Sequence, residues 1–449
     1  MEHEPSVAPA HRVTPRCRHF GECGGCAWQH IEYAEQLRIK QKRVEELLGD
    51  RGSKDPRYTS DDVPPGTSAA KEDPRHSVVR PTLPTPSPDG GAPWGFRNKA
   101  SFVFAPGGRG RPLVMGHFRR GSRTVLPVEE CPVHADAGNR FAFAVRDALV
   151  QAGIPGATAD GQQGVARHVV VRVSEGTGEL VGTLVVTENV KALRRVTADL
   201  EARLAAADKA GRRPRIGFHL NVHERPDPYL FGRETRQLFG LSGLREQVAG
   251  VSYLVSPTAF FQTNVRAAEV LVGVVLNAIA DPGLRRVLDL YAGVGLFALP
   301  LAKAGRIVSA IEENREAVAS AEAALRLNGI DQDACRLVAS RVEDAMIRQT
   351  ASGTGPRLRG AKGGSGAGWD AVVLDPPRQG CPPRVLDWVF RNIRPARIVY
   401  VSCDPDALAR DLARVAGSGY HFERVQPIDM FPHTEHIETV AVLTRTAGS

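Results

Sequence analysis

The sequence lacks the apolar segments that carry a chain into or across a membrane. Its first residues are polar and contain no hydrophobic core of a signal peptide. The longest apolar run, residues 270–280, contains Asn277 and is too short to span a bilayer. We therefore expect a cytoplasmic protein without membrane contact. Its 449 residues, 42% of them hydrophobic, suffice for about three domains with buried cores.

Acidic residues are missing from one long stretch, residues 91–128, although the whole chain has a net charge of only +8. Seven basic residues lie there: Arg97, Lys99, Arg109, Arg111, Arg119, Arg120 and Arg123. Five aromatic residues are interleaved with them: Trp94, Phe96, Phe102, Phe104 and Phe118. Cations beside flat rings are typical of single-stranded RNA binding. A solvated strand face with a few core aromatics is the alternative.

The first half of the chain divides by composition into three parts. Residues 1–50 hold three close cysteines and a predicted helix at residues 31–48. Residues 51–93 are rich in Pro, Ser, Asp and Gly, which predicts a disordered insert. Residues 94–255 contain short β-branched or aromatic runs at residues 100–105, 168–173 and 180–187, with helices predicted at 139–153 and 190–207. We interpret this third part as an α+β domain.

From residue 256 to 449 predicted strands alternate with helices. The strands are at residues 286–290, 307–312, 370–374 and 397–402, and helices at 316–327 and 383–392 separate some of them. A second low-complexity insert covers residues 349–368. This alternation predicts an α/β domain with a parallel sheet covered by helices.

A glycine-rich turn follows the first of these strands. Gly293 and Gly295 permit close approach of the backbone to a ligand, and Glu312 at the end of the next strand can bind ribose hydroxyls. The spacing also fits a dinucleotide site, so a nicotinamide-dependent oxidoreductase is an alternative. Asp289 and the strand-end Asp375-Pro-Pro instead favour a cationic amino-acid cofactor and a methyl transfer to a planar base.

Cys403 follows the last of the four strands, at the edge where Asp375 is expected. Uracil C5 is too weak a nucleophile to attack a methylsulfonium, but a thiolate that adds to C6 converts the ring into an enolate that can do so. A base must then remove the C5 proton. The late segment 431–438 offers His433, Glu435, His436 and Glu438. A buried, inert cysteine is the alternative for an isolated thiol.

Taken together, these motifs resemble the 5-methyluridine RNA methyltransferases that act on tRNA or 23S ribosomal RNA. The segments that carry the resemblance are FFQTN (260–264), DLYAGVG (289–295), LDPPRQG (374–380), SCDP (402–405) and FPHTEHIE (431–438). The resemblance implies a class I (Rossmann-like) methyltransferase domain that uses S-adenosylmethionine. It implies Cys403 as nucleophile and Glu438 as base. It also implies a cofactor and target-base pocket lined by Gln262, Tyr291, Glu312 and Asp375.

Three of the seven cysteines are closely spaced, Cys17, Cys23 and Cys26, and Cys131 is the best candidate for a fourth metal ligand. From the residues alone, zinc and an iron–sulfur cluster are both possible. The resemblance implies a [4Fe-4S] cluster with a structural role, and it favours 23S ribosomal RNA over tRNA as the substrate.

Further expectations concern the whole protein. We expect a monomer. With 16 residues before Cys17, we expect that the β-barrel domain that ribosomal RNA relatives often carry ahead of the cysteines is either absent or lost from the gene model. A non-catalytic RNA-binding module is a third functional alternative. Binding of S-adenosylhomocysteine without NAD would separate the methyltransferase from the oxidoreductase.

Overall fold

The computed structural model describes residues 7–49, 78–108, 110–207, 215–224, 230–351, 368–415 and 417–446. The chain forms two compact units. Unit 1 comprises Met1–Glu32, Ser87–Gln247 and Leu254–Val265, and unit 2 comprises Tyr33–Pro86, Val248–Tyr253 and Arg266–Ser449. The cysteine-rich segment and the helix after it, which we predicted as one part, therefore belong to different units. The predicted domain boundaries remain predictions.

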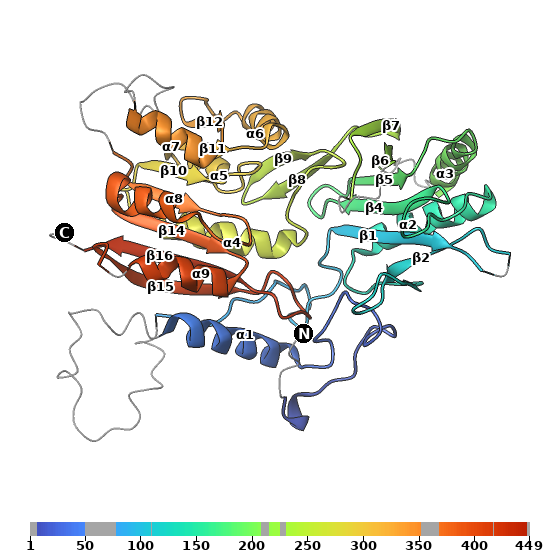
Figure 1. Ribbon diagram of the computed structural model, residues 1–449, viewed down its shortest axis with the longest axis horizontal. Helices are drawn as coiled ribbons and strands as arrows, with labels where there is room; N and C mark the ends of the chain where they lie inside the picture. Colours follow the sequence, from blue (N-terminus) through green and yellow to red (C-terminus); the bar gives the residue numbers. More distant parts are fainter. Residues whose placement is uncertain are drawn as a thin grey trace. The chain divides into compact units, whose positions relative to one another are not determined.

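Unit 1 is built on a seven-stranded sheet with the order β3-β2-β1-β4-β5-β6-β7 (Figure 1). All neighbours are antiparallel except β5 and β6. The strands are β1 (Lys99–Pro106), β2 (Leu113–Phe118), β3 (Val125–Pro127), β4 (Ala166–Val173), β5 (Leu180–Val186), β6 (Ile216–Val222) and β7 (Glu234–Gly240). Helices α2 (Asp136–Gln151) and α3 (Leu193–Ala207) pack on the sheet and share one hydrophobic core with it. This arrangement confirms the α+β prediction.

Unit 2 contains a second seven-stranded sheet, in the order β12-β11-β10-β13-β14-β16-β15. The first five strands are parallel, and β16 and β15 complete the sheet in antiparallel fashion. They are β10 (Arg286–Leu290), β11 (Ile307–Glu312), β12 (Cys335–Ala339), β13 (Ala371–Leu374), β14 (Arg397–Ser402), β15 (Tyr420–Ile428) and β16 (Glu438–Arg445). The order 3-2-1-4-5 of the parallel strands is that of a Rossmann-like sheet. The predicted fold class is confirmed.

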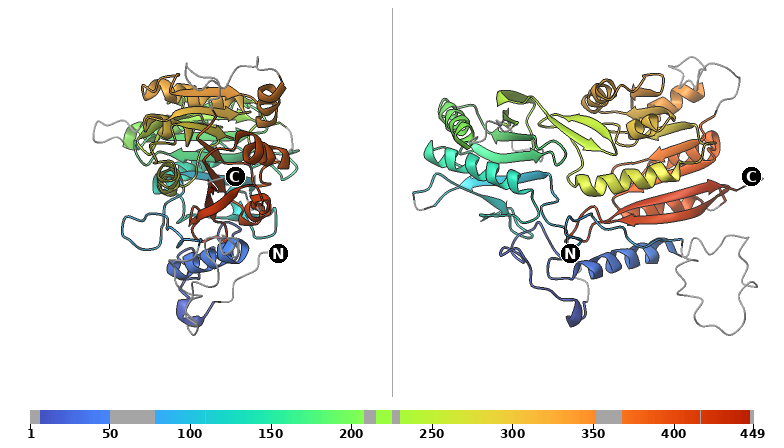
Figure 2. Two further views of the ribbon diagram at one scale, coloured as in Figure 1. Left: turned by 90° about the vertical axis from the view of Figure 1, so that its left-hand side faces the viewer. Right: turned by 180° about the vertical axis from the view of Figure 1, so that it is seen from behind.

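Helices cover this sheet, as Figure 2 shows from two sides. They are α1 (Tyr33–Leu48), α4 (Val265–Ala278), α5 (Ala298–Lys303), α6 (Arg315–Leu327), α7 (Val342–Ala351), α8 (Pro383–Asp387) with a π-helical turn at Trp388–Ile393, and α9 (Pro405–Leu412). Side chains of α1, α7, α8 and α9 form one core with alternate residues of the strands. A two-stranded sheet, β8 (Leu244–Val248) with β9 (Val251–Val255), connects the two units along the chain.

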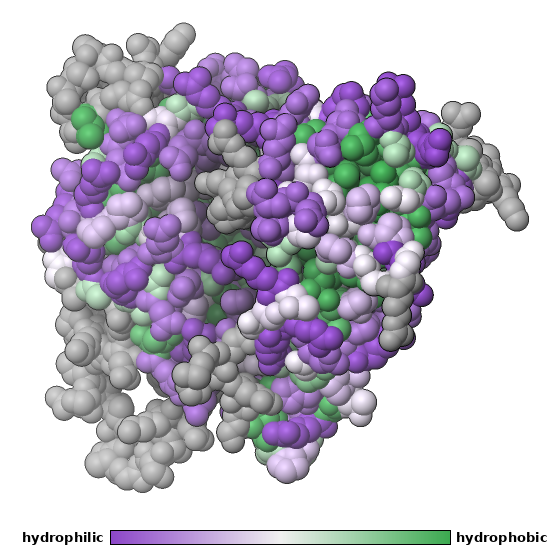
Figure 3. All heavy atoms as spheres, turned by 45° about the vertical axis from the view of Figure 1, so that its right-hand side comes forward, coloured by the Kyte–Doolittle hydropathy of each residue, from purple (hydrophilic) through white to green (hydrophobic). Residues whose placement is uncertain are grey.

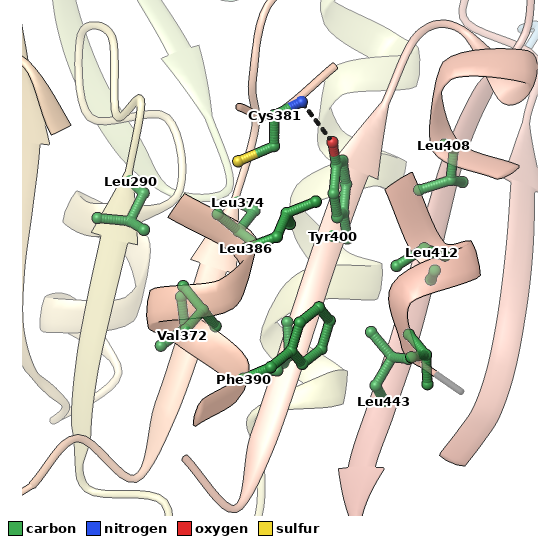
Figure 4. Packing of buried hydrophobic residues seen from close by; sticks show 14 of the residues in the cluster. Leu290, Val372, Leu374, Cys381, Leu386, Phe390, Tyr400, Leu408, Leu412 and Leu443 are labelled. Atoms are coloured by element: carbon green, nitrogen blue, oxygen red, sulfur yellow. Dashed lines mark hydrogen bonds between the residues drawn. The ribbon is translucent and has the colours of Figure 1, made fainter. Parts of the chain in front are cut away.

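A buried polar network lies inside this core. The Tyr400 hydroxyl donates to Asp411 Oδ2 at 2.6 Å, and the Cys381 amide donates to the same oxygen at 2.7 Å. Figure 4 shows Cys381 and Tyr400 among the packed leucines, with the 3.1 Å bond from the Cys381 amide to the Tyr400 hydroxyl drawn. The network ties the loop after β13 to β14 and α9. It therefore fixes the segment that begins with Asp375.

The two predicted inserts lie largely outside the described residues, which omit 50–77 and 352–367. The described part of the first insert runs beside β15, where Val79 bridges Val425 and Leu83 bridges Ile428. Val79 is buried there. Residues 78–86 thus belong to unit 2 and extend its sheet edge.

Hydrophilic residues predominate on the molecular face drawn in Figure 3, with smaller hydrophobic patches between them. Within the ranges that the structure describes, the helices are all too short or too polar to cross a membrane. The apolar run at residues 270–280 lies mostly in α4, where Leu271, Val272 and Val275 are buried in the protein. The apolar residues of this run therefore pack in the hydrophobic core of the protein.

Candidate active site and cysteine cavity

Polar side chains stand at the carboxyl ends of four neighbouring parallel strands of unit 2. Asp289 lies in β10, Glu312 ends β11, Asp375 follows β13 and Cys403 follows β14. In parallel sheets ligands bind at this edge, where the strand order reverses. The reversal falls at β10, between β11 and β13. The sheet therefore gathers four residues that the sequence singled out.

The turn after β10 holds Glu312 by backbone hydrogen bonds. Gly293, at φ +56°, donates from its amide to Glu312 Oε2 at 2.8 Å, and the Asn314 amide donates to Oε1 at 2.7 Å. Tyr291 also has a left-handed φ of +65°, a conformation that non-glycine residues rarely adopt. The carboxylate is thus fixed at the strand end while its side chain stays partly exposed. This geometry suits recognition of vicinal hydroxyls.

Asp289 is completely buried, and neither of its carboxylate oxygens has a hydrogen-bond partner of good geometry among the described residues. Burial raises the pKa of this carboxyl well above its ordinary value, and the neighbouring Asp375 adds to the shift. An unsatisfied buried acid calls for a polar or cationic ligand group nearby. The DLYAGVG turn thus contains a group suited to a cationic cofactor.

Cys403 and Glu438 are brought together by strand pairing. Ser402 of β14 pairs with Thr439 of β16, so the next residue of one strand and the preceding residue of the other are neighbours. Burial raises the pKa of the Cys403 thiol to about 11, and the charge of Glu438 contributes to the shift. The charge of Arg378, in the loop after β13, lowers the pKa of the Cys403 thiol. The predicted nucleophile and base therefore share one electrostatic environment.

Two carboxyls, those of Glu438 and Asp375, influence each other in this environment. Glu438 is only 5% exposed, and burial together with the charge of Asp375 raises its pKa well above the ordinary value. Burial also raises the pKa of Asp375 to about 7. Carboxyls that interact closely cannot both ionise easily. Asp375 and Glu438 can thus hold and move a proton beside the Cys403 thiol.

The segment that leads to Glu438 is anchored by α1. The Lys40 ammonium donates to Asp429 Oδ1 at 2.6 Å and to the Phe431 carbonyl at 3.1 Å. Gln36 Oε1 accepts from the His433 amide at 2.9 Å, and His433 has a φ of +64°. The predicted candidates His433 and Glu438 are buried, whereas His436 is exposed. Nothing in the sequence indicated this anchor, because a lysine in a charged helix predicts a solvated side chain.

Gln262 belongs to unit 1, apart from the other predicted cofactor residues. Its loop is held on the sheet of unit 1, where the Asn98 amide donates to the Thr263 carbonyl at 2.9 Å and the buried Arg172 guanidinium donates to the Ala259 carbonyl. Gln262 is partly exposed, and the neighbouring Phe260 is 74% exposed. The loop therefore presents both side chains to solvent.

All four predicted metal ligands lie around one cavity of unit 1. Cys17, Cys23, Cys26 and Cys131 line a cavity of about 410 Å³ together with His117 and His134. Burial raises the pKa of Cys131 to about 12, with a contribution from the charge of Cys26, and burial also raises the pKa values of Cys17 and Cys26. Thiols that bind no metal are protonated in such surroundings. The four thiols therefore share one cavity, although among the described residues the ligand atoms within 4.8 Å of one another are those of His117, Cys131 and His134.

The predicted RNA-binding stretch is only partly exposed, which corrects one interpretation. Phe96, Phe102 and Phe104 are buried, with at most 2% exposure. Phe102 and Phe104 alternate along β1 on the side that faces the core, and Phe96 lies before this strand. Those three rings cannot stack on bases. Phe118 is 42% exposed, and Trp94 lies against the Arg16 guanidinium at 5.2 Å.

Two of the predicted cations also line the cysteine cavity. Arg97 and Lys99 both contribute to its wall. Burial lowers the pKa of Lys99 to about 8, and the charge of Arg172 adds to the shift. The other basic residues of the stretch that the structure describes, Arg111, Arg119, Arg120 and Arg123, are exposed.

Known proteins resemble this chain over nearly its whole length. A profile of the family described as tRNA (Uracil-5-)-methyltransferase matches residues 243–446. An uncharacterized RNA methyltransferase of Gloeobacter violaceus is 33% identical over 440 residues, which cover 98% of this chain and 84% of the relative. One of Geobacter sulfurreducens is 32% identical over 443 residues, 97% of this chain and 78% of the relative.

A solved structure is similar as well. The Pyrococcus abyssi tRNA (uracil-54, C5)-methyltransferase in complex with S-adenosyl-L-homocysteine superposes with a TM-score of 0.68 and 25% sequence identity. The superposition covers 98% of this chain and 86% of the other.

Proposed function

The chain belongs to the RNA (uracil-5-)-methyltransferases, which act with S-adenosylmethionine, and within this family we propose that it methylates a uridine of 23S ribosomal RNA through a covalent bond between Cys403 and carbon 6. Family membership excludes the oxidoreductase alternative. The observation that carries the mechanistic proposal is the convergence of Cys403, Glu438 and Asp375 at one sheet edge.

The chemistry follows from these three residues. The Cys403 thiol releases its proton to solvent, and the thiolate adds to C6 of the uracil, which places negative charge on C5 and O4. S-adenosylmethionine supplies the methyl group that C5 takes up. Glu438 then removes the C5 proton, the C5–C6 double bond forms again, and the Cys403 thiolate leaves. A carboxylate whose pKa is raised by burial is a stronger base, as C–H proton abstraction requires.

The cofactor would be held mainly by unit 2. Glu312, fixed by two backbone amides, would accept hydrogen bonds from ribose hydroxyls, and Tyr291 would line the same pocket. The unsatisfied carboxyl of Asp289 supports a cationic group nearby. Asp375 would stand between cofactor and target base. Gln262, a residue of unit 1, stays a predicted cofactor residue on the resemblance alone. The target uridine must leave its stack to reach these groups.

We propose that Cys17, Cys23, Cys26 and Cys131 hold a [4Fe-4S] cluster with a structural role in unit 1. The shared cavity and the mutual influence of the thiols on their pKa values support four sulfur ligands. Zinc is the second candidate, since it accepts four thiolates equally well. Reconstitution of the apoprotein with iron and sulfide separates the two by visible absorption, which zinc does not give.

The substrate proposal rests on the cysteine set, because the resemblance associates such cysteines with 23S ribosomal RNA. Transfer RNA is the second candidate, because the solved relative from Pyrococcus abyssi is named a tRNA enzyme. Mapping 5-methyluridine in total RNA of a deletion strain tests both. Loss of one 23S position that returns with the wild-type gene supports the proposal. Loss from tRNA alone refutes it in favour of the second candidate.

A further inference from the structure

A second set of potential metal ligands lies in the wall of the cysteine cavity. His117, in β2, and His134, just before α2, each bring a ring nitrogen near the Cys131 thiol, and the three ligand atoms lie within 4.8 Å of one another. All three residues belong to unit 1. Such a spacing matches three ligands of a single metal ion.

Both imidazoles have a buried nitrogen without a hydrogen bond of good geometry. His134 is 4% exposed, and its Nδ1 makes no hydrogen bond of good geometry in the part of the chain that the structure describes, where the Asn139 side chain is a weak partner of the ring. His117 Nε2 is likewise buried and without a partner there. Buried polar atoms of this kind need an explanation, and an absent ion is a common one.

The rings are held in place by the core and by backbone groups. The Phe102 ring stacks on His117 with centroids 4.8 Å apart and meets His134 edge-on at 5.2 Å. The backbone beside Cys131 is also fixed, because the Asn139 Nδ2 amide donates to the Cys131 carbonyl at 2.9 Å and the His134 amide donates to it at 3.1 Å. Outer contacts that orient ligands are typical of metal sites.

We infer that His117, Cys131 and His134 bind one zinc-like divalent cation when the four-cysteine site is empty. Two imidazoles and one thiolate suit Zn²⁺, and a water molecule would complete the tetrahedron. Binding displaces the Cys131 proton into solvent. Because Cys131 belongs to both sets, the single ion and the proposed cluster exclude each other, so one cavity has two alternative metal states.

Metal binding alone tests the site formed by His117, Cys131 and His134, independently of methyl transfer. The full-length protein is purified, stripped of metal under anaerobic, reducing conditions, and titrated with Zn²⁺ and separately with Co²⁺. We expect one equivalent of either ion. The Co²⁺ spectrum should show tetrahedral d–d bands with the charge-transfer intensity of a single thiolate.

Matched variants separate the two ligand sets. His117→Ala and His134→Ala should abolish stoichiometric Zn²⁺ binding yet still accept an iron–sulfur cluster on reconstitution. Cys17→Ala should still bind one equivalent of Zn²⁺ but accept no iron–sulfur cluster. Cys131→Ala should bind neither Zn²⁺ nor the cluster. The opposite pattern, with Zn²⁺ retained in the histidine variants and lost in Cys17→Ala, would overturn the inference, as would the spectrum of three or four thiolates.

A folding defect must not be mistaken for a lost ligand. The melting temperature of each metal-free variant is therefore compared with that of the metal-free wild type. If an alanine variant is unfolded, His134→Asn and His117→Gln replace it and retain most of the ring volume. Zn²⁺ binding unchanged in these folded variants contradicts the proposal, and its loss supports it.

Discussion

The Lys40 ammonium in α1 lies 2.6 Å from the Asp429 carboxylate, and the two side chains are only 1% and 0% exposed. Lys40 also reaches the Phe431 carbonyl, and Gln36, one helical turn earlier, holds the backbone of His433. Helix α1 thus fixes the segment that runs from Asp429 to the proposed base Glu438.

Replacing Lys40 by methionine should destabilise the protein by about 3–5 kcal/mol, because it leaves the Asp429 charge buried without its partner. Denaturant-induced unfolding measures the loss. Lys42→Met is the matched control, since the exposed pair with Glu46 should change stability by less than about 1 kcal/mol. Equal effects of the two substitutions would contradict the anchoring role.

Glu438→Gln should trap a covalent protein–RNA species. The thiol adds and the methyl group is transferred, but the C5 proton stays, so Cys403 cannot leave. With radiolabelled methyl donor and substrate RNA, the label should migrate with the protein on a denaturing gel and be absent from Glu438→Gln/Cys403→Ala. Release of methylated RNA at the wild-type rate by Glu438→Gln would refute the base assignment.

Cys403 should react slowly with iodoacetamide at neutral pH. Its raised pKa of about 11 lies about two units above that of an ordinary thiol, so the thiolate fraction near pH 8 is roughly 100-fold smaller. Alkylation followed by peptide mass spectrometry should accelerate as the pH rises towards 11.

Glu438→Gln removes one of the charges that raise the pKa of Cys403, so alkylation at pH 8 should become faster in this variant. The urea-unfolded chain supplies the reference rate. Rates that are equal in the folded and unfolded protein would show that the thiol is not perturbed.

Two substitutions in the hydrogen-bond network around Asp411 should lower the stability of the protein by different amounts. Asp411→Asn weakens the bonds from both the Tyr400 hydroxyl and the Cys381 amide, and should cost about 1–3 kcal/mol. Tyr400→Phe removes both bonds of the Tyr400 hydroxyl, but the stronger bond from the Cys381 amide to Asp411 remains, so this variant should cost less. Thermal unfolding, with affinity for S-adenosylhomocysteine as a second readout, distinguishes the variants. A larger loss of stability in Tyr400→Phe than in Asp411→Asn would contradict the role of Asp411 as the centre of the network.

Anaerobically purified protein should contain about four iron atoms and four sulfides per chain if the cluster proposal holds. Serine at position 17, 23, 26 or 131 should remove most of both. Cys335→Ser is the control, because this buried cysteine lies in β12 of unit 2 and is not among the residues that line the cavity. Iron that persists in the Cys26→Ser protein would contradict the assignment of that ligand.

The sequence predicted the Rossmann-like sheet closely. The strands at residues 286–290, 307–312 and 397–402 were predicted with the bounds that β10, β11 and β14 have. Buried parallel strands form uninterrupted apolar runs between turn residues, and such runs are easily recognised. Strands β12 and β15 at the two edges of this sheet, and β7 at an edge of the sheet in unit 1, were not predicted, because edge strands carry several partly or fully exposed side chains that interrupt the apolar pattern.

The candidate site was predictable where a residue follows a recognisable strand. Asp375 and Cys403 could be assigned to one edge because parallel strands end together. The Lys40–Asp429 pair and His117 could not be found in this way, since their partners lie far away in the sequence and only tertiary contacts bring them together. The buried rings of Phe102 and Phe104 were wrongly interpreted as surfaces for base stacking. The many basic residues around them drew attention away from the alternation of buried and exposed side chains along β1.

Tyr291 and His433 carry left-handed backbone conformations in two segments that line or support the proposed site. Each costs about 1–2 kcal/mol relative to an ordinary conformation, so these segments relax most easily when their anchoring contacts weaken. On heating, the site should therefore lose its arrangement before the two sheets melt. The temperature of inactivation would then lie below the temperature of global unfolding, and bound cofactor would narrow the gap.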